Sequence, residues 1–140
     1  MTQFFHENFS NDRSLELPII QKLINAYKLW QNYLPNFPQT VRYTLGSKID
    51  SCFIETIENV FTAAHASRLE RERERESKSV CLKNATKNLD LLKFFLQIAY
   101  QIKALDNKKY ITISEGLYEI GKMLGGWERS LNQKNDNKLF

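Results

Sequence analysis

The residues of this chain that could carry catalysis are few, and their spacing fits no common catalytic or metal-binding pattern. His6 and His65 have no cysteine or carboxylate at ligand spacing, and the segment HENF is not an HExxH motif. Cys52 and Cys81 form no CxxC motif, no histidine is close to either in sequence, and no GxSxG segment is present. The sequence therefore predicts no catalytic, cofactor-binding or metal site, and we expect a protein that is not an enzyme.

A helical ribonuclease of the HEPN type is one alternative to this interpretation. Such an enzyme would carry an Arg-x(4–6)-His motif near the end of a helix. No histidine follows Arg68 or any later arginine, so the motif is absent. This alternative would require metal-independent RNA cleavage that disappears when His65 is replaced.

Three of the five glycines lie in the segment YEIGKMLGGW, which runs from Tyr118 to Trp127. The segment matches neither GxxxxGK[ST] nor GxGxxG, and no strand precedes it, so a phosphate-binding loop is not predicted. We expect Gly125 or Gly126 to end a helix in the left-handed conformation, with Trp127 folding back on the last turn. Gly121 costs about 1 kcal/mol relative to alanine inside a helix, so we expect another helix to approach closely there.

The positive charge of the chain is concentrated in its second half. The formal net charge is +4 and the pI is about 9.1. Residues 1–76 hold nine Lys/Arg against ten Asp/Glu, whereas residues 77–140 hold eleven against six. This distribution favours an anionic partner such as nucleic acid.

The segment RLERERERE (Arg68–Glu76) carries no net charge, because its four arginines and four glutamates cancel. On a helix, strict alternation places opposite charges three residues apart and like charges four residues apart, so the two effects nearly cancel as well. We interpret the segment as a solvated helix extension or a mobile connection rather than a nucleic-acid-binding arm.

Apolar residues recur at helical spacing in four segments and predict four amphipathic helices. These start at Pro18, between Thr40 and Thr44, at about Ser79 and after the capping residue Asp106 or Asn107, and they end near Leu34, Ala64, Leu105 and Trp127. Short connections between them predict an all-α fold, an antiparallel up-down-up-down four-helix bundle. The expected organisation is a flexible N-terminal arm at 1–16, the bundle at 17–130 and a disordered C-terminal tail at 131–140.

The first and third predicted helices are more apolar than a bundle core requires. Between Leu91 and Tyr100, eight of ten residues are apolar, and the segment from Ile19 to Leu34 is nearly as rich. A bundle helix needs an apolar stripe only a little over 100° wide. We expect the surplus to be exposed on a single chain and to mark self-association or a protein partner.

No apolar run approaches the roughly 18–20 residues that cross a bilayer. The N-terminal segment lacks the basic and apolar regions of a signal peptide. We expect a cytoplasmic protein with reduced cysteines and no membrane partner, in which Cys52 is a small core residue.

Three motifs, in this order, resemble signatures of one family. They are FPQTVRYTLGSKI (Phe37–Ile49), LDLLKFFLQIA (Leu89–Ala99) and YEIGKMLGGW (Tyr118–Trp127). Together they resemble the accessory variability determinant (Avd) of diversity-generating retroelements. That family belongs to a wider set of small four-helix bundles that includes proteins encoded by ribosomal RNA intervening sequences. The similarity spans roughly Pro18 to Ser130.

The resemblance implies a non-enzymatic accessory protein that forms a ring-like homopentamer. It implies binding to the reverse transcriptase of the retroelement and to RNA and DNA, namely the template-repeat RNA or its cDNA, in mutagenic retrohoming. An alternative is an oligomeric adaptor or RNA-associated protein of the intervening-sequence type, without a retroelement. A reverse transcriptase gene beside the gene for this chain would favour the first interpretation.

Candidate contacts to nucleic acid or protein come from two sources. Four residues stand where the resemblance implies a basic residue or match the RxTLG part of the first motif: Arg42, Lys48, Lys93 and Lys122. Seven more are predicted by helical phase, which points them away from the core stripes: Lys22, Lys28, Lys83, Lys87, Lys103, Lys108 and Lys109. We expect structural roles for Thr44 as a helix cap and for Gly46 at a site of close packing.

Overall fold

The chain forms four long helices and two short ones in the computed structural model, which describes residues 16–65 and 71–139. The long helices are α2 (Glu16–Tyr33), α4 (Leu45–Ala64), α5 (Arg71–Gln101) and α6 (Asn107–Leu139). A 3-10 turn, η1 (Leu34–Asn36), and a one-turn helix, α3 (Gln39–Arg42), connect α2 to α4. No strand occurs in these two ranges, and the predicted all-α fold is confirmed. The segments 1–15 and 66–70, on which parts of the predicted arm and of the Arg/Glu run fall, lie outside the described residues.

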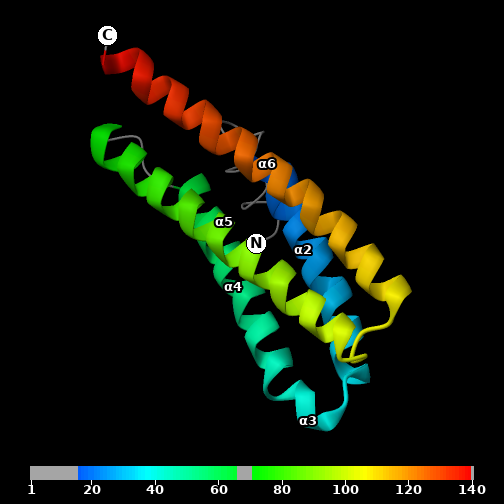
Figure 1. The fold of residues 1–140 in the computed structure, drawn as a ribbon. Coiled ribbons are helices and arrows are strands. Elements are labelled where there is room, and N and C mark those ends of the chain that lie inside the picture. Colours follow the sequence, from blue (N-terminus) through cyan, green and yellow to red (C-terminus); the bar gives the residue numbers. More distant parts are fainter. Residues whose placement is uncertain (1–15, 66–70, 140) are drawn as a thin grey trace, which may run out of the picture.

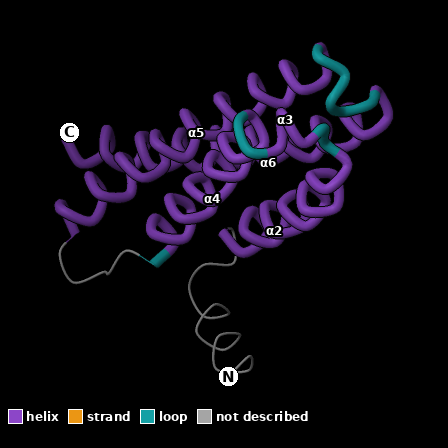
Figure 2. Tube along the Cα trace, turned by 90° about the horizontal axis from the view of Figure 1, so that it is seen from below, coloured by secondary structure: helices purple, strands orange, loops and turns teal. Residues whose placement is uncertain are grey.

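The four long helices form an antiparallel bundle in which each helix packs beside the next along the chain (Figures 1 and 2). α4 and α5 have the most extensive contact, followed by α5 with α6, and α6 closes the bundle against α2. α5 and α6, with 31 and 33 residues, continue past α2 and α4 at the end where the C-terminus lies (Figure 1). This arrangement is the predicted up-down-up-down bundle.

The connection from α2 to α4 is held by side chains of the first motif. Pro35 and Pro38 interrupt helical geometry in this connection. Arg42 donates hydrogen bonds from Nη2 to the carbonyl oxygens of Pro35 (2.9 Å) and Phe37 (3.0 Å). Leu34 Cδ1 lies 2.9 Å from the position that a Cβ would take on Gly46, so the predicted close packing at this glycine is confirmed.

Thr44 occupies the N-cap position of α4, as predicted, but its hydroxyl does not cap the helix. Its Oγ1 donates instead to the carbonyl oxygens of Thr40 and Val41, both at 3.3 Å. The hydroxyl therefore joins the Thr44 amide, which also donates to the carbonyl of Val41 (3.3 Å), in closing the preceding turn.

The core is a continuous apolar cluster drawn from all four long helices. Trp30 is completely buried, and its ring lies 5.3 Å from that of Phe37 and 6.2 Å from that of Phe53. Cys52 is also buried, which confirms its predicted place in the core. The largest fully buried side chains include Leu23, Ile49, Leu82, Leu89, Leu92, Leu96, Ile113, Leu117 and Ile120.

Asp50 joins α2 to α4 at the edge of this core. Its Oδ1 accepts hydrogen bonds from the hydroxyl of Tyr27 (2.9 Å), from Nε1 of Trp30 (3.1 Å) and from Nε2 of Gln31 (3.3 Å). The carboxylate therefore satisfies the only polar atom of a buried tryptophan.

The prediction that the last helix ends at Gly125 or Gly126 is wrong. No glycine in the described residues has a positive φ, and α6 continues past both glycines to Leu139. Two glycines cost only about 2 kcal/mol of helix propensity, and no proline follows them. Leu131 is buried beyond them, and the hydroxyl of Thr86 on α5 donates to Glu128 Oε1, so contacts with α5 offset the cost. Trp127 is half-buried within the helix and does not fold back on its end.

The third predicted helix starts earlier and ends earlier than expected. α5 begins at Arg71, so residues 71–76 of the Arg/Glu run extend the helix, as one of the two interpretations predicted. It ends at Gln101, because Lys103 adopts a φ of 65° and the amides of Ala104 and Leu105 close back on the carbonyl of Ala99. Asp106 then caps α6 through Oδ1, which accepts from the amide of Lys109 (2.9 Å).

Part of the predicted apolar surplus is exposed. On α5, Val80 and Phe94 are more than half exposed, and Tyr100 is partly exposed where it stacks on Tyr110 of α6. On α2, only Ile24 is exposed among the large apolar residues of the described part. The surplus of α5 is therefore a surface feature, whereas most of that of α2 is buried.

Candidate nucleic-acid interface

The glycines of the YEIGKMLGGW motif leave space that cationic side chains occupy. Lys93 reaches across from α5, and its Nζ lies 3.1 Å from the position that a Cβ would take on Gly121. On α6 itself, Nη1 of Arg129 lies 3.4 Å from the corresponding position on Gly125. A side chain at either glycine would compete with the cation for this space. Gly121 and Gly125 are four residues apart, so these two positions are separated by about 6 Å along the helix axis.

A third cation extends this series toward the start of α6. Nζ of Lys122 lies 4.8 Å from the ring centroid of Tyr118, a cation–π contact. Tyr118 is three residues before Gly121 and therefore neighbours it on the helix surface. We call Lys93, Lys122 and Arg129 the cation row.

Tyr118 adds an aromatic surface to the cation row. Its side chain is 61% exposed. Exposed aromatic rings beside cations are the elements with which proteins bind single-stranded nucleic acid, because bases stack on the ring while cations neutralise phosphates.

Two carboxylates of α6 lie beside the cation row in sequence and contact other helices. Glu119 Oε2 pairs with Lys22 Nζ of α2 at 2.7 Å; this hydrogen bond and the charge of Lys22 lower the pKa of Glu119, and the charge of Lys122 lowers it as well. Glu128 Oε1 accepts the hydroxyl of Thr86 on α5. Neither contact with a neutral group nor a shared ion pair removes a carboxylate charge completely, so Glu119 and Glu128 partly offset the positive charge of the cation row.

The structure brings together only some of the predicted basic residues. Lys93 and Lys122 belong to the cation row. Lys103, Lys108 and Lys109 lie at the turn between α5 and α6, where Lys109 Nζ is 3.9 Å from Asp106 Oδ2 and 5.5 Å from the ring of Tyr33.

The other predicted residues are distributed over different parts of the bundle. Lys28 is exposed on α2 and Lys83 is exposed on α5, while Lys22 pairs with Glu119. Arg42 is half-buried and binds backbone carbonyls, which explains its place in the motif without a ligand. No single surface therefore contains all eleven predicted residues.

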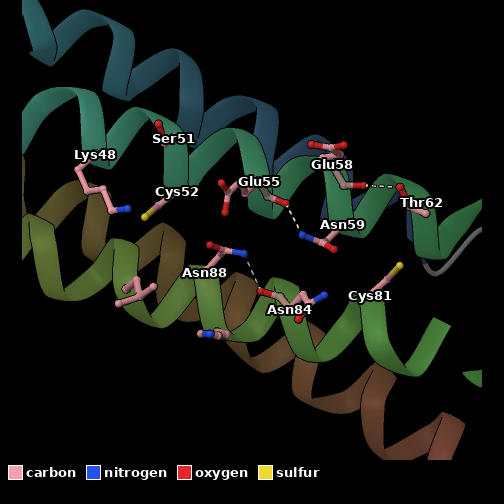
Figure 3. A pocket seen from close by; sticks show the side chains of 12 residues that line it. Lys48, Ser51, Cys52, Glu55, Glu58, Asn59, Thr62, Cys81, Asn84 and Asn88 are labelled. Carbon is pink, nitrogen blue, oxygen red and sulfur yellow. Dashed lines mark hydrogen bonds between the residues drawn. The ribbon is translucent and has the colours of Figure 1, made fainter. Parts of the chain in front are cut away.

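Lys48 and Lys87 line a groove of about 580 Å³ between α4 and α5 (Figure 3). The amides of Asn59 and Asn88 project into this groove but donate back to their own helices, at 2.8 and 3.0 Å. Two glutamates of α4 also line it and balance the two lysines. A groove without net charge offers little attraction for phosphate, so we do not place the nucleic-acid interface here.

Neither cysteine is prepared for nucleophilic chemistry. Both line the same groove, and burial raises the pKa of the Cys52 and Cys81 thiols, which keeps them protonated at neutral pH. His65 is exposed at the end of α4 and stacks on Phe61 with ring centroids 4.0 Å apart. Within the described ranges, no group of three or more potential metal ligands occurs.

The helices that the structure describes include none that is both long and apolar enough to span a bilayer.

Sequence reasoning missed Arg129 and Tyr118. Arg129 follows Gly125 by four residues, and helical side chains lean toward the N-terminus, so the sequence contained a signal for its position over the glycine. The predicted helix end at Gly125 or Gly126 places Arg129 outside the helix and hides this signal. Tyr118 precedes Lys122 by four residues, which is the spacing of a neighbouring pair on one helix face.

A comparison with protein-family models gives a match over most of the chain. The family model described as bAvd-like matches residues 17–131. No curated protein and no solved structure gives a significant match.

Proposed function

The chain belongs to the bAvd-like family, the accessory variability determinant family whose motifs it resembles, and we propose that it is the accessory protein of a diversity-generating retroelement. In this proposal the protein has no catalytic activity of its own. It binds nucleic acid, the template-repeat RNA or its cDNA, together with the reverse transcriptase that copies it in the cytoplasm. The family membership supports the retroelement role, and the cation row supports nucleic-acid binding.

The observation that carries nucleic-acid binding is the position of the cation row over a glycine-lined stretch of α6. Lys93, Lys122 and Arg129 come from two helices, yet they lie within about three turns of α6 beside an exposed tyrosine. Cations about one helical turn apart suit a polyanion that runs along the helix. Each phosphate that they neutralise would release counterions and make binding depend on salt.

Self-association is the second part of the proposal. The exposed Phe94 and Val80 and the half-buried Leu91 and Ile98 form an apolar strip along α5. We propose that this strip contacts a second copy of the chain and that the assembly is the homopentamer implied by the resemblance. Repetition in a ring would multiply the positive charge of each cation row.

A charge-matched pair of triple variants tests nucleic-acid binding. The first variant replaces the cation row (Lys93→Gln, Lys122→Gln and Arg129→Gln), and the second replaces three exposed lysines elsewhere (Lys28→Gln, Lys48→Gln and Lys83→Gln). Both lose three positive charges, so a difference between them reports position rather than total charge. Binding to single-stranded RNA is measured by fluorescence anisotropy over a series of salt concentrations.

We expect the first variant to lose about 10- to 100-fold in affinity at low salt, and the slope of log affinity against log salt to fall by about 0.7 per lost phosphate contact. The second variant should change affinity by no more than about threefold. Equal losses in both variants would mean that only net charge matters, and unchanged binding in the first would exclude the cation row.

The partnership with the reverse transcriptase is tested separately. A reverse transcriptase gene and a pair of near-identical repeats are expected beside the gene for this chain. The enzyme encoded there should co-purify with this chain after nuclease treatment. Failure to co-purify, with RNA binding intact, would leave the intervening-sequence type of RNA-associated protein as the better interpretation.

A further inference from the structure

The contact between α5 and α6 continues from the cation row toward the turn that joins the two helices. Lys93 of α5 lies over Gly121 of α6, and seven residues further along α5 the ring of Tyr100 stacks on that of Tyr110. Residues seven apart share one face of a helix and are separated by about 10 Å along its axis. Tyr100 and Tyr110, which we call the tyrosine pair, therefore lie on the same α5–α6 seam as the cation row.

The tyrosine pair forms a flat aromatic surface that is already ordered. The two ring centroids are 4.6 Å apart, and the ring planes are inclined by only 11°. Tyr110 is half-buried, whereas Tyr100 is 37% exposed. Tyr100 therefore offers aromatic surface to a planar group, and because Tyr110 already holds its ring, binding costs little side-chain entropy.

Tyr118 is a second aromatic surface on this seam. It precedes Gly121 by three residues, and its ring lies 4.8 Å from Nζ of Lys122. It follows Tyr110 by eight residues on α6, which is about 12 Å along the axis. Two aromatic surfaces with cations beside them therefore follow one another along the seam, as in proteins that bind single strands.

The charges at the α5–α6 turn favour an anion. Residues 101–110 hold three lysines and one aspartate, a net charge of +2. The aspartate, Asp106, is engaged by Lys109 through the backbone amide (2.9 Å) and through Nζ (3.9 Å). Lys103 and Lys108 are exposed. The seam therefore has cations at both ends, the cation row at one and these lysines at the other.

Carboxylates limit what charge alone can contribute along the seam. Glu128 lies within it, and the exposed Asp90 and Glu115 are three residues before Lys93 and Tyr118. A ligand held only through its phosphates meets these carboxylates as well as the cations. The bases of a duplex are paired with each other, whereas the bases of a single strand are free to stack on aromatic rings. A single strand therefore uses more of this surface than a duplex does.

We propose that the α5–α6 seam binds single-stranded nucleic acid, with bases stacked on Tyr118 and on the tyrosine pair and with phosphates at the cation row and Lys103. Nucleic-acid binding as proposed above is the premise, and the seam adds the form of the ligand, its length and two stacking positions. Tyr110 and Arg129 are about 28 Å apart along α6. At about 3.4 Å per nucleotide, a stacked strand of about eight nucleotides covers this length, and an extended strand needs fewer.

Replacement of single tyrosines tests the stacking positions. Tyr118→Leu and Tyr100→Leu remove an aromatic ring but keep an apolar side chain that suits a helix, whereas Tyr118→Phe and Tyr100→Phe keep the ring. Tyr43→Leu is the control for loss of a surface tyrosine, since Tyr43 is 70% exposed and lies between α3 and α4. The affinity for single-stranded RNA is measured by fluorescence anisotropy over a series of salt concentrations, and urea unfolding checks that each variant is folded.

We expect each seam leucine variant to lose about 5- to 100-fold in affinity, and the phenylalanine variants and Tyr43→Leu to stay within about twofold of wild type. The slope of log affinity against log salt should not change, because no phosphate contact is removed. Tyr118 is exposed enough for its replacement to leave the bundle folded, so the test does not depend on Tyr100→Leu alone.

The cation-row variant in the same assay separates this inference from its premise. Leucine variants that bind as tightly as the phenylalanine variants would overturn base stacking, and a loss in the cation-row variant would then leave nucleic-acid binding in place. Normal binding by the cation-row variant as well would overturn nucleic-acid binding at this seam altogether.

A comparison of ligands tests the form and length of the strand. Single strands of about 4 to 16 nucleotides and duplexes of the same lengths are titrated into the wild-type chain. We expect affinity to rise steeply up to about eight nucleotides and slowly beyond, and single strands of that length to bind at least about tenfold more tightly than duplexes. Duplexes that bind equally well or better would overturn the proposal, because charge density would then govern binding.

Discussion

At the scale of single residues, Gly121 shows how a missing side chain can make room for a neighbouring residue rather than allow an unusual backbone conformation. Its φ is not positive, so no conformational requirement explains it. Its lack of a Cβ instead makes room for Nζ of Lys93. Gly116 lies five residues earlier on α6, and no neighbouring atom comes within 4 Å of the position that a Cβ would take there. The two glycines therefore have different physical meanings.

This difference predicts opposite effects on stability and on binding for Gly121→Ala. The new Cβ should stabilise α6 by about 0.5–1 kcal/mol through helix propensity and, because the lysine end is flexible, displace Lys93 rather than strain the bundle. We expect RNA affinity to fall by about three- to tenfold, a loss of roughly 1 kcal/mol. Denaturant unfolding and RNA anisotropy measure the two effects.

Gly116→Ala is the matched control. It should give a similar gain in stability, because it is also an interior position of α6, and no change in RNA affinity. If the two variants bind RNA equally well, Gly121 does not serve the position of Lys93.

At the scale of elements, Asp50 fixes how α2 lies on α4. One carboxylate oxygen accepts hydrogen bonds from Tyr27, Trp30 and Gln31. Apolar contact alone would allow these helices to slide against each other, whereas three donors converging on one atom define their register. The hydrogen bond to Asp50 also contributes, after burial, to the raised pKa of Tyr27.

We predict that Asp50→Ala destabilises the bundle by about 2–3 kcal/mol, because the buried indole N–H of Trp30 and the hydroxyl of Tyr27 lose their acceptor. Urea unfolding followed by tryptophan fluorescence measures the change. Asp90→Ala, at an exposed position of α5, should change stability by less than about 0.5 kcal/mol. Similar losses in both variants would show that Asp50 acts only as a surface charge.

At the scale of the whole molecule, the proposed self-association rests on the apolar strip of α5. Phe94 is 54% exposed in the middle of a helix that packs against α4 and α6. A large exposed aromatic side chain flanked by Leu91 and Ile98 is typical of a contact surface. The proposed assembly therefore depends on a surface that the bundle itself does not need.

We predict that light scattering on the wild-type chain gives a multiple of the 16.5 kDa protomer mass, five in the proposed pentamer. Phe94→Ser should raise the concentration at which the assembly dissociates by about 10- to 100-fold, since burying a phenylalanine contributes about 1.5–3 kcal/mol. Ile111→Ser, a comparably exposed position on α6, should leave the mass unchanged. A wild-type mass of one protomer would refute self-association.

The sequence by itself determined the bundle and the family. Helical periodicity is a local property, so it indicated four amphipathic helices, and the prolines before α3 and the capping Asp106 marked two of the connections correctly. Three motifs in order identified the family that the comparison supports. The end of α6 was predicted wrongly because helix propensity counts only the local cost of two glycines. The tertiary contacts of Leu131 and Glu128 offset this cost.

Only the tertiary structure decided which basic residues lie close together. The eleven candidates could not be ranked by helical phase or motif position. Phase indicates that a side chain points away from the apolar stripe of its own helix, but not which residues of other helices it contacts. Packing of α5 against α6 placed Lys93 over Gly121, whereas Lys28 lies on α2 and Arg42 binds backbone carbonyls of the α2–α4 connection. A charged surface is a property of helices brought side by side, and that arrangement is set by the core rather than by the charges themselves.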